Sequence, residues 1–534
     1  MKKIFTLLAI INFLPALSNG QSFEWVSNHP SLYSLNPGMV ESAVTVVPSG
    51  GVVSSRLDSF AVHYGQDAYG KVIIERKDAG GGVLWSYLLY EKAFIKRLTA
   101  DQNGNVYVCG GFLDNLNCNG NTDQLFNTGI GFNVNLFLLK LDASGNLVWK
   151  RNLALTHSET ILDATNLDPS GNFWYSLNDF NNSSIFRVDA NGDDADSLRQ
   201  ENSLVLSSFD FDPWGNLFIA GATTTGTLTF GNQSFTVPET YMMYLGRYDI
   251  NRNASWAYFG HDITFQHPEI VSDNLGNAYM AGTVFDSISF GTLHFPAPQW
   301  SEEFFLFKID SAGVFQWGKS NPANLSLPIT GRFLPERSKY LDADLAGNVY
   351  IGGKSAGVMD WGNGIVLTAG SGQLFENLIS IVSFDGSGNS RWGKIFGSDT
   401  YSGLHSLATT DVGDVYFSAG LRDSSVFDTI FFPGVSTMNF ALGKIARPIN
   451  TDLVEINQEL QSIYPVPSKG IIHFLGNEIQ GEIRFYDLTG KLVHSDTHQS
   501  NLPYNAAVLK DGFYLMEFVH PRGSEKFRWM KVSE

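Results

Sequence analysis

Asp344-Leu345-Ala346-Gly347-Asn348-Val349-Tyr350-Ile351-Gly352-Gly353 is a turn followed by a strand, and the phrase recurs along most of this 534-residue chain. Asp at the first position and Gly at the fourth are typical of a type I turn. The carboxylate can bond the turning backbone, and glycine accepts a positive φ. The β-branched and aromatic run that follows predicts a buried strand. The other copies carry the turn glycines Gly50, Gly104, Gly171, Gly215, Gly276 and Gly413.

A second phrase alternates with the first, and it consists of a strand, a similar turn and a strand that ends in tryptophan. Its clearest copies are residues 137–149 and 305–317, and residues 185–192 keep the hairpin without the tryptophan. Each repeat therefore predicts two linked hairpins, which together make a four-stranded antiparallel sheet. Further copies of the second phrase end at Trp85, Trp256 and Trp392.

The spacing of the repeats favours an all-β protein, a seven-bladed β-propeller over residues 21–447. The turn glycines lie about 60 residues apart on average, near the period of four-stranded blades. Six good blades with a degenerate first one is the alternative count. The last repeat lacks its Trp strand before Pro448, whereas Phe23-Glu24-Trp25-Val26 has no hairpin before it. We expect this N-terminal strand to complete the last blade and close the ring, which removes exposed sheet edges.

The N-terminus has the composition of a secretory signal peptide. Lys2 and Lys3 precede the apolar run Ile4 to Leu17, and small residues follow up to Gly20. Residues 1–20 are therefore predicted to be removed before Gln21. The run is too short to span a bilayer, and no other apolar segment reaches that length, so we expect no transmembrane segment in the mature chain. A net charge of −18 argues against nucleic acid and anionic membranes as partners.

The chain has two cysteines, Cys109 and Cys118. An exported protein matures in an oxidising compartment, where two cysteines this close in sequence can form a local disulfide. The alternative is a pair of unlinked thiols, with Cys109 a small apolar strand residue. The sequence favours the bridge.

Residues 448–462 form a predicted linker, and residues 463–534 change pattern to a compact β module. Its expected strands are residues 471–475, 482–487, 491–494, 512–519 and 526–532.

This tail resembles the C-terminal sorting domain, type A, of the type IX or Por secretion system. Val466 stands where the usual opening has Asn. The resemblance implies a small β-sandwich and passage through the type IX machinery across the outer membrane. It also implies removal of the tail, with release or attachment to surface lipopolysaccharide. The matching positions are Tyr464, Pro465, Pro467, Gly470, Asp487, Gly490, Lys491, Gly512 and Tyr514.

Residues 40–447 look like the bacterial seven-bladed propeller repeats often joined to such tails. That resemblance implies architecture and no single activity, because function depends on sites and not on the fold.

The turn carboxylates raise the question of calcium, which prefers several oxygen ligands within one loop. The segments 189–194, 210–216 and 342–348 are rich in such oxygens, but they lack the alternating ligands and the distal Glu of a standard calcium loop. Hydrogen-bonded turns are the simpler explanation, so we predict no metal and no cofactor, with calcium as the weaker alternative. The sequence has no HExxH, GxSxG or Walker motif, and no catalytic residue is predicted.

Aromatic residues divide into two groups by their place in the repeat. The repeated Trp and Tyr residues are expected to pack between blades. Trp300 and Trp361 lie between the second and third strands of their repeats, where variable insertions often bind ligands. They are the two candidate ligand-binding residues.

The sequence favours a secreted or cell-surface binding or adhesion protein without enzymatic activity. Its ligand would be an extracellular glycan or protein. The alternative is an exported polysaccharide hydrolase or lyase with its site in the propeller channel, and a structural cell-surface component is a third. Two carboxylates and a histidine clustered at the channel mouth would favour the enzyme.

Overall fold

A computed structural model gives the fold of the chain as two compact units, Gly20–Pro448 and Ile449–Glu534 with the N-terminal residues. Every element in the described residues is a β-strand. The structure describes residues 21–30, 42–64, 67–120, 124–127, 134–153, 160–261, 267–285, 287–296, 302–320, 331–335, 339–369, 378–398, 401–434, 437–447, 460–464, 469–476, 480–487, 490–499, 502–520 and 523–532. The predicted signal peptide lies outside them.

The body consists of antiparallel sheets built from successive groups of four strands. The first sheet joins two such groups, because the long strand β5 pairs with β4 through its first half and with β6 through its second. The order in this sheet is β2-β3-β4-β5-β6-β8-β9, with β7 paired to β6. Its strands are β2 (Val44–Val46), β3 (Val52–Tyr64), β4 (Asp67–Lys77), β5 (Val83–Ala100), β6 (Val106–Cys118), β7 (Gln124–Leu125), β8 (Asn135–Leu141) and β9 (Leu147–Asn152).

The next three sheets follow the chain in the same way, each as a four-stranded antiparallel group. The first has the order β10-β11-β12-β13 and comprises β10 (Thr165–Leu167), β11 (Phe173–Asn178), β12 (Asn182–Val188) and β13 (Asp194–Glu201). The second comprises β14 (Ser203–Phe211), β15 (Leu217–Thr223), β18 (Met242–Tyr248) and β19 (Ala254–His261). The third comprises β20 (Glu269–Ser272), β21 (Ala278–Phe285), β24 (Glu302–Ile309) and β25 (Phe315–Ser320).

The following sheet is centred on β28 and β30, and the last one uses both ends of the body. The former comprises β26 (Arg332–Pro335), β27 (Leu341–Ala343), β28 (Val349–Asp360), β29 (Val366–Ala369), β30 (Leu378–Phe384) and β31 (Ser390–Ser398). The latter has the order β32-β33-β36-β1 and comprises β32 (Tyr401–Thr409), β33 (Val415–Arg422), β36 (Met438–Ile445) and β1 (Phe23–Pro30).

The predicted pairing of the N-terminal strand with the last repeat is confirmed. β1 runs antiparallel to β36, with Trp25 opposite Lys444 and Val26 opposite Gly443. The backbone of Ala446 also donates to Ser22 O at 3.0 Å. The sheet therefore draws its fourth strand from the other end of the body.

Short hairpins between the second and third strands of a repeat cover neighbouring sheet edges. β16 pairs with β13 of the preceding sheet, and β34 pairs with β31 of the preceding sheet. Such pairing satisfies backbone groups that a bare edge would leave open. The hairpins are β16 (Gly226–Phe230) with β17 (Gln233–Val237), β22 (Ile288–Phe290) with β23 (Leu293–Phe295), and β34 (Ser425–Phe427) with β35 (Ile430–Phe432).

The turn chemistry of the repeated phrase is visible at Asp344. Its carboxylate accepts the backbone N–H of Asn348 at 2.9 Å, and the Asn348 side chain donates back at 2.8 Å. Gly347 closes the turn on Asp344 O with a φ of 75°. The weak copy in the last repeat begins one residue earlier than its sequence suggests, at Thr410, whose hydroxyl accepts Asp414 N at 3.0 Å. The repeated Asp is thus a structural turn residue.

The repeated tryptophans bind the turn of the following repeat, as predicted for inter-blade packing. The indole N–H of Trp85 donates to Ala143 O at 3.0 Å, and that of Trp317 donates to Gly386 O at 3.1 Å. The Trp317 ring also lies 2.8 Å from where a Cβ on Gly388 would stand. Trp25 makes the same contact to Ala79 O at 2.9 Å, which joins the last sheet to the first.

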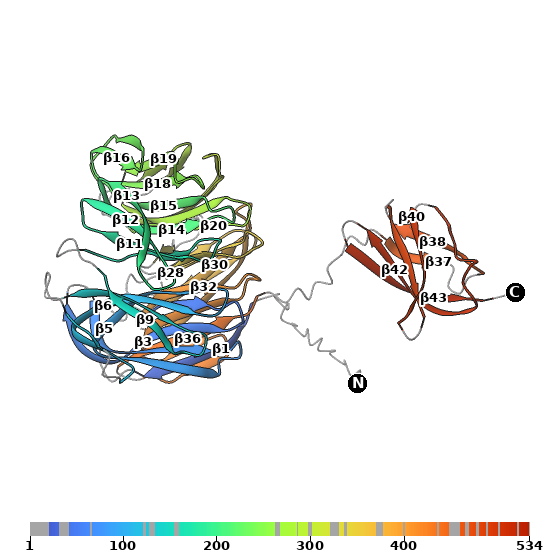
Figure 1. Ribbon diagram of the computed structural model, residues 1–534, viewed down its shortest axis with the longest axis horizontal. Helices are drawn as coiled ribbons and strands as arrows, with labels where there is room; N and C mark the ends of the chain where they lie inside the picture. Colours follow the sequence, from blue (N-terminus) through green and yellow to red (C-terminus); the bar gives the residue numbers. More distant parts are fainter. Residues whose placement is uncertain are drawn as a thin grey trace, which may run out of the picture. The chain divides into compact units, whose positions relative to one another are not determined.

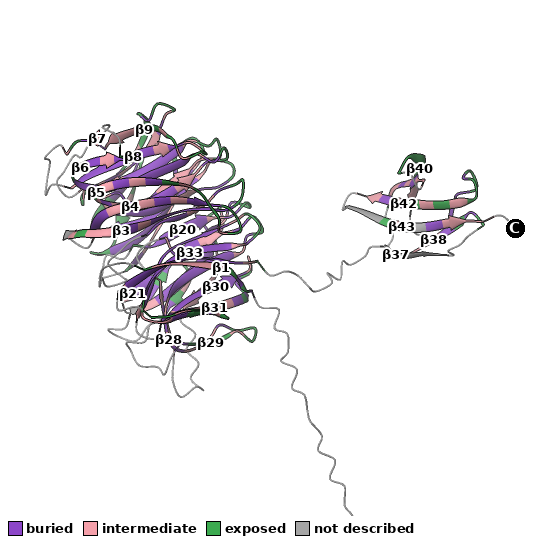
Figure 2. Cartoon of the chain, turned by 90° about the horizontal axis from the view of Figure 1, so that it is seen from below, coloured by how far each residue is buried: buried purple, intermediate pink, exposed green. Residues whose placement is uncertain are grey.

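The first strand of each four-stranded group is called here its inner strand, and β14, β20 and β32 lie towards the middle of the body (Figure 1). Figure 2 shows that buried residues follow the strands of the body and that exposed residues gather at the turns. The inner strands of the first and last sheets meet directly. Val44 N of β2 donates to Ser406 Oγ of β32 at 3.3 Å. The neighbouring strand β33 adds a bond from Ser418 Oγ to Ser42 O, just before β2, at 3.0 Å.

The predicted disulfide between Cys109 and Cys118 is wrong. No disulfide links the two buried cysteines, and both belong to the single strand β6. Nine residue steps along an extended strand place their Cα atoms about 30 Å apart, whereas a disulfide needs less than about 7 Å. Burial raises the pKa of the Cys109 thiol to about 12, so it remains protonated. Cys109 is an apolar strand residue, which was the alternative interpretation.

The C-terminal unit contains two small antiparallel sheets, and its strands match the predicted set with two additions, β37 and β41. β37 begins inside the predicted linker. One sheet has the order β37-β38-β41 and comprises β37 (Leu460–Tyr464), β38 (Ile471–Gly476) and β41 (Tyr504–Asn505). The other has the order β40-β39-β42-β43 and comprises β39 (Gln480–Tyr486), β40 (Leu492–Gln499), β42 (Gly512–His520) and β43 (Gly523–Lys531).

Replacing Trp25 with alanine tests the contact between the last sheet and the first. We expect the loss of the half-buried indole and its hydrogen bond to lower the free energy of unfolding by about 2–4 kcal/mol. Trp214→Ala is the matched control, because the Trp214 side chain is 57% exposed, and it should cost less than about 1 kcal/mol. Urea unfolding measures both. Equal losses in the two variants would contradict the contact.

His29 in β1 makes the stability of the last sheet depend on pH. Burial lowers the pKa of His29 below its ordinary 6.5. The positive charges of Arg56 and Lys77 lower this pKa further, and the negative charge of Glu75 partly opposes them. Its Nε2 is buried without a hydrogen-bond partner in the described structure. A lowered folded-state pKa means that the unfolded chain binds the proton more readily, so stability falls as pH drops through 6.5. In His29→Gln, the melting temperature should fall less steeply as the pH drops through 6.5. An unchanged slope would count against the assignment.

Candidate functional site

Charged side chains of the inner strands form a buried cluster. Arg97 of β5 and Glu269 of β20 make an ion pair at 2.8 Å, with side chains 11% and 8% exposed. Ser208 of β14 donates to the other oxygen of Glu269 at 3.1 Å. Burial raises the pKa of Glu269, and the positive charges of Arg97 and Lys339 oppose that shift. The pair connects sheets that are far apart in sequence.

Further polar groups extend this cluster. The Tyr340 hydroxyl accepts the backbone N–H of Glu269 at 3.1 Å and lies 2.9 Å from Ala281 O. The Asp163 carboxylate accepts from Asn178 Nδ2 at 2.8 Å and lies 4.0 Å from Lys96 Nζ. Each of these groups therefore has protein partners.

Two carboxylates nearer the turns also join neighbouring sheets. Asp210 of β14 accepts Ser272 N at 2.6 Å, Ser272 Oγ at 2.9 Å and Asn166 Nδ2 at 2.6 Å. Burial raises the pKa of Asp210 to about 6, and the negative charge of Asp342 contributes. Asp342 of β27 accepts Thr409 N at 2.7 Å. These carboxylates link the inner strands to one another.

His405 of β32 lies in the same set of strands, with its Nδ1 2.9 Å from Ser42 Oγ. Carboxylates and a histidine therefore occur on or beside the inner strands, but hydrogen bonds to other protein groups hold them. The sequence prediction did not select these residues. The sequence did contain a sign of them, because several repeats carry a polar side chain four residues before the turn aspartate, where an apolar one is expected. These polar residues are Arg97, Ser208, Glu269 and Tyr340, and they precede Asp101, Asp212, Asp273 and Asp344.

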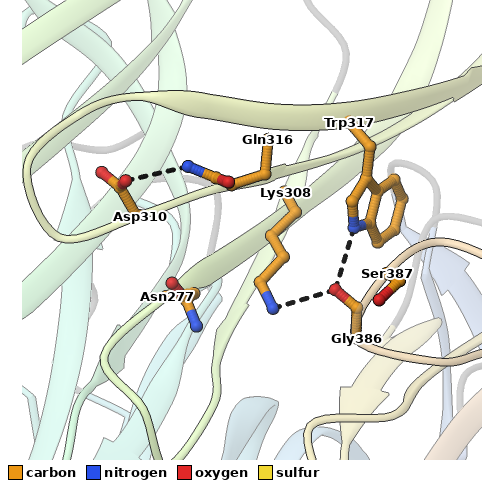
Figure 3. Close-up of a pocket in the computed structure, with 7 residues that line it drawn as sticks. All are labelled: Asn277, Lys308, Asp310, Gln316, Trp317, Gly386 and Ser387. Carbon is orange, nitrogen blue, oxygen red and sulfur yellow. Dashed lines mark hydrogen bonds between the residues drawn. The ribbon is translucent and has the colours of Figure 1, made fainter.

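A polar cavity of about 410 Å³ opens between the β20–β25 sheet and the turn after β30 (Figure 3). Gln316 of β25 donates to Asp310 Oδ2 at 2.8 Å on one side, and Trp317 donates to Gly386 O on the other. Lys308 lies between them, with Nζ 3.1 Å from Gly386 O and 3.3 Å from Asp273 Oδ2. Asn277 and Ser387 complete the lining.

Three polar atoms in this cavity have no protein partner within the described structure. They are Asn277 Oδ1, Gln316 Oε1 and Ser387 Oγ, although Gln316 Nε2 and Asn277 Nδ2 are hydrogen-bonded. Unused acceptors around an open cavity are available to a hydroxyl or amide ligand. We call this set, with Trp317, the Gln316 pocket.

Trp361, one of the two predicted ligand-contacting residues, is part of the core. It is 8% exposed and packs edge-on against Phe304 at 5.9 Å and Phe333 at 5.3 Å. Its position is in fact a repeated one, because it corresponds to the fully buried Phe230, Phe290 and Phe427 of other repeats. A ring that fills the space between sheets cannot contact a ligand, so this prediction is corrected. Trp300 lies outside the described residues.

The remaining predicted positions take structural roles where they are described. The turn carboxylates that raised the question of calcium accept hydrogen bonds from their own loops, as Asp212 does from Asn216 N at 2.9 Å. No group of three or more His, Cys, Asp or Glu in the described ranges is arranged to hold a metal ion. The same part of the chain contains no helix long and apolar enough to cross a membrane.

In the tail, the turn at Asp487 closes through Gly490 N at 2.9 Å, and Lys491 N donates to the Asp487 carboxylate. Gly470 O accepts Ala506 N at 2.7 Å, and Tyr514 Oη donates to Lys510 O at 2.8 Å. Gly512 begins β42, and Tyr464 ends β37. Pro465 and Pro467 lie outside the described residues.

The Arg97–Glu269 pair should behave as a buried ion pair. Glu269→Gln leaves the Arg97 charge without its counter-charge, and we expect a loss of about 3–5 kcal/mol in the free energy of unfolding. The double variant Arg97→Met with Glu269→Met should cost less than Glu269→Gln alone, because it removes both charges. Guanidinium unfolding measures this order, and the reverse order would show that the pair is solvated.

Two solved structures show a remote likeness to this chain. A protein of unknown function from Bacteroides caccae is 11% identical, with 61% of this chain and 90% of that chain covered and a TM-score of 0.31. The virginiamycin B lyase from Staphylococcus aureus, a β-propeller, is 11% identical over 79% of this chain and 100% of that chain, with a TM-score of 0.39. At these scores neither likeness carries an argument about function.

No curated protein matches the chain. Residues 462–529, however, match the family model described as the secretion system C-terminal sorting domain. This domain marks proteins that the type IX system exports to the cell surface or the extracellular space. Residues 462–529 are therefore a secretion system C-terminal sorting domain, attached to an all-β body.

Proposed function

We propose that this protein is an extracellular, non-enzymatic binding protein whose body is a closed seven-bladed propeller. The observation that carries the proposal is the contrast between its two polar regions. The described charged residues of the inner strands bind one another across sheets, as Arg97 and Glu269 do. The Gln316 pocket instead leaves three polar atoms without protein partners.

A cycle of contacts supports the closed ring of seven. Each inner strand contacts the next, and the last contacts the first. Trp25 adds a hydrogen bond from the last sheet to Ala79 O, in the turn of the first copy of the second phrase. Six sheets with a degenerate first repeat would not account for the contact of β2 with β5. The contacting pairs are β2 with β5, β5 with β10, β10 with β14, β14 with β20, β20 with β27, β27 with β32, and β32 with β2.

One observation favours the alternative, an exported polysaccharide hydrolase or lyase. Asp210 has a pKa raised to about 6 and lies near the carboxylate of Asp342, as a general acid and its partner would. Its oxygens, however, already accept three hydrogen bonds from Ser272 and Asn166. A carboxylate held in this way is better suited to joining sheets.

The export route completes the proposal. Residues 1–20 serve as the signal peptide that is removed before Gln21, and residues 21–447 form the propeller. Residues 448–462 link it to the sorting domain, residues 463–534, which the type IX machinery recognises. The family match to residues 462–529 supports this assignment of the tail.

A glycan array and a peptide array, both probed with the chain that begins at Gln21, test the proposed function. We expect a defined ligand class to be retained, and we expect no turnover when the retained glycans are incubated with the protein and analysed by mass spectrometry. Cleavage of a retained glycan that stops in Asp210→Asn would overturn the non-enzymatic assignment. Retention of nothing on either array would overturn the binding function.

A further inference from the structure

We propose that the Gln316 pocket binds a neutral pyranose sugar, recognised through its hydroxyl groups by Gln316, Asn277 and Ser387 beside Trp317. This inference rests on the proposed binding function and names its ligand class. The cavity of about 410 Å³ falls in the range of small-ligand sites, about 300–1,000 Å³.

The unused atoms in the pocket suit hydroxyl groups. Gln316 Oε1 and Asn277 Oδ1 can only accept hydrogen bonds, whereas Ser387 Oγ can accept or donate. A sugar presents adjacent hydroxyls that each donate one hydrogen bond and accept others, so one ring can satisfy all three atoms. Gln316 is held in place for this role because its Nε2 donates to Asp310 Oδ2 and to Val314 O.

The charges of the pocket disfavour an anion. Lys308 is the only cation among the described residues that line it, and its Nζ is already 3.3 Å from Asp273 Oδ2 and 3.1 Å from Gly386 O. Asp310 adds a negative charge on the opposite side (Figure 3). Net negative surroundings repel phosphate and carboxylate groups. A neutral polar ligand avoids both this repulsion and the loss of hydrogen bonds that an apolar ligand would cause.

The pocket also lies where the repeats differ. Most of its residues belong to the repeated turns, but Gln316 precedes the repeated tryptophan at a position with no fixed residue. The scaffold tolerates many side chains at this position, because its geometry comes from the neighbouring tryptophan. The corresponding residues in other repeats are Leu84, Val148, Ser255 and Arg391.

The test is saturation-transfer NMR on the chain that begins at Gln21, with glucose, galactose, mannose, N-acetylglucosamine and their 1,4-linked disaccharides as probes. We expect at least one probe to bind. Gln316→Val should weaken that binding about tenfold or more, since it removes the pocket's fixed acceptor. The variant should keep its melting temperature, because Val148 occupies the same position in another repeat.

Ser255→Val, at the corresponding position of β19, is the matched control and should leave binding unchanged. Ser387→Ala is a second variant that removes no side-chain hydrogen bond within the described part of the chain, and it should weaken binding about threefold to tenfold. A peptide retained in a Gln316-dependent manner, with no sugar bound, would overturn the ligand class.

Sugar binding that is equal in the native chain and in Gln316→Val would overturn the site while leaving the proposed binding function intact. Failure of every sugar and of both arrays would overturn the two proposals together.

Discussion

The architecture depends on one contact found at Trp25, Trp85, Trp256 and Trp317, in which the tryptophan of one repeat donates its indole N–H to a turn carbonyl of the next. At Trp317 the acceptor is Gly386 O, and the ring lies over Gly388, whose φ is 83°. A side chain at Gly388 would meet the ring, and the positive φ would strain any L-residue. The turn, its glycine and the tryptophan therefore constrain one another. This mutual constraint explains why the two phrases recur together along the chain.

The same contact separates scaffold from candidate site. Residues that hold neighbouring sheets together recur in most repeats, as the Asp344 turn does, and the polar atoms of that turn are used within the protein. A residue beside the fixed tryptophan is under no such demand. Gln316 occupies such a position, and its Oε1 is unused by the described protein. A candidate ligand-binding residue, Gln316, can therefore stand next to a structural residue, Trp317, on the same strand.

Much of the fold could be predicted because its determinants are local. The turn at Asp344 and the pairing of β1 with β36 follow from sequence patterns of a few residues. The cysteine prediction failed because proximity in sequence is not proximity in space when both residues lie in one extended strand. Trp361 was misassigned because it occupies the same buried hairpin position as Phe290 in another repeat. The two residues differ in type, so the sequence did not reveal that their positions correspond.

The Arg97–Glu269 pair could not be predicted by any local rule. Its partners are 172 residues apart in the chain, and only the arrangement of the sheets brings them together. The sequence can show that a charged residue replaces an apolar one at a repeated position, but it cannot show which charge meets it. The Gln316 pocket has the same origin, since it combines residues 277–317 with the turn of a later repeat. Local patterns thus predict the framework, and contacts between repeats determine the sites.

The placement of β1 has a consequence for the order of folding. Its only strand partner in the described structure, β36, ends at Ile445, and Ala446 N binds Ser22 O. The last sheet therefore cannot be completed until nearly the whole body has been synthesised. Pairing across so long a separation carries a loop-closure cost that rises only slowly with length, but it delays the contact relative to hairpins within each repeat. The hairpins can form as the chain emerges, whereas the joining of the last sheet to the first through Trp25 must come at the end. The outer edge of β36 therefore stays unpaired until β1 joins it.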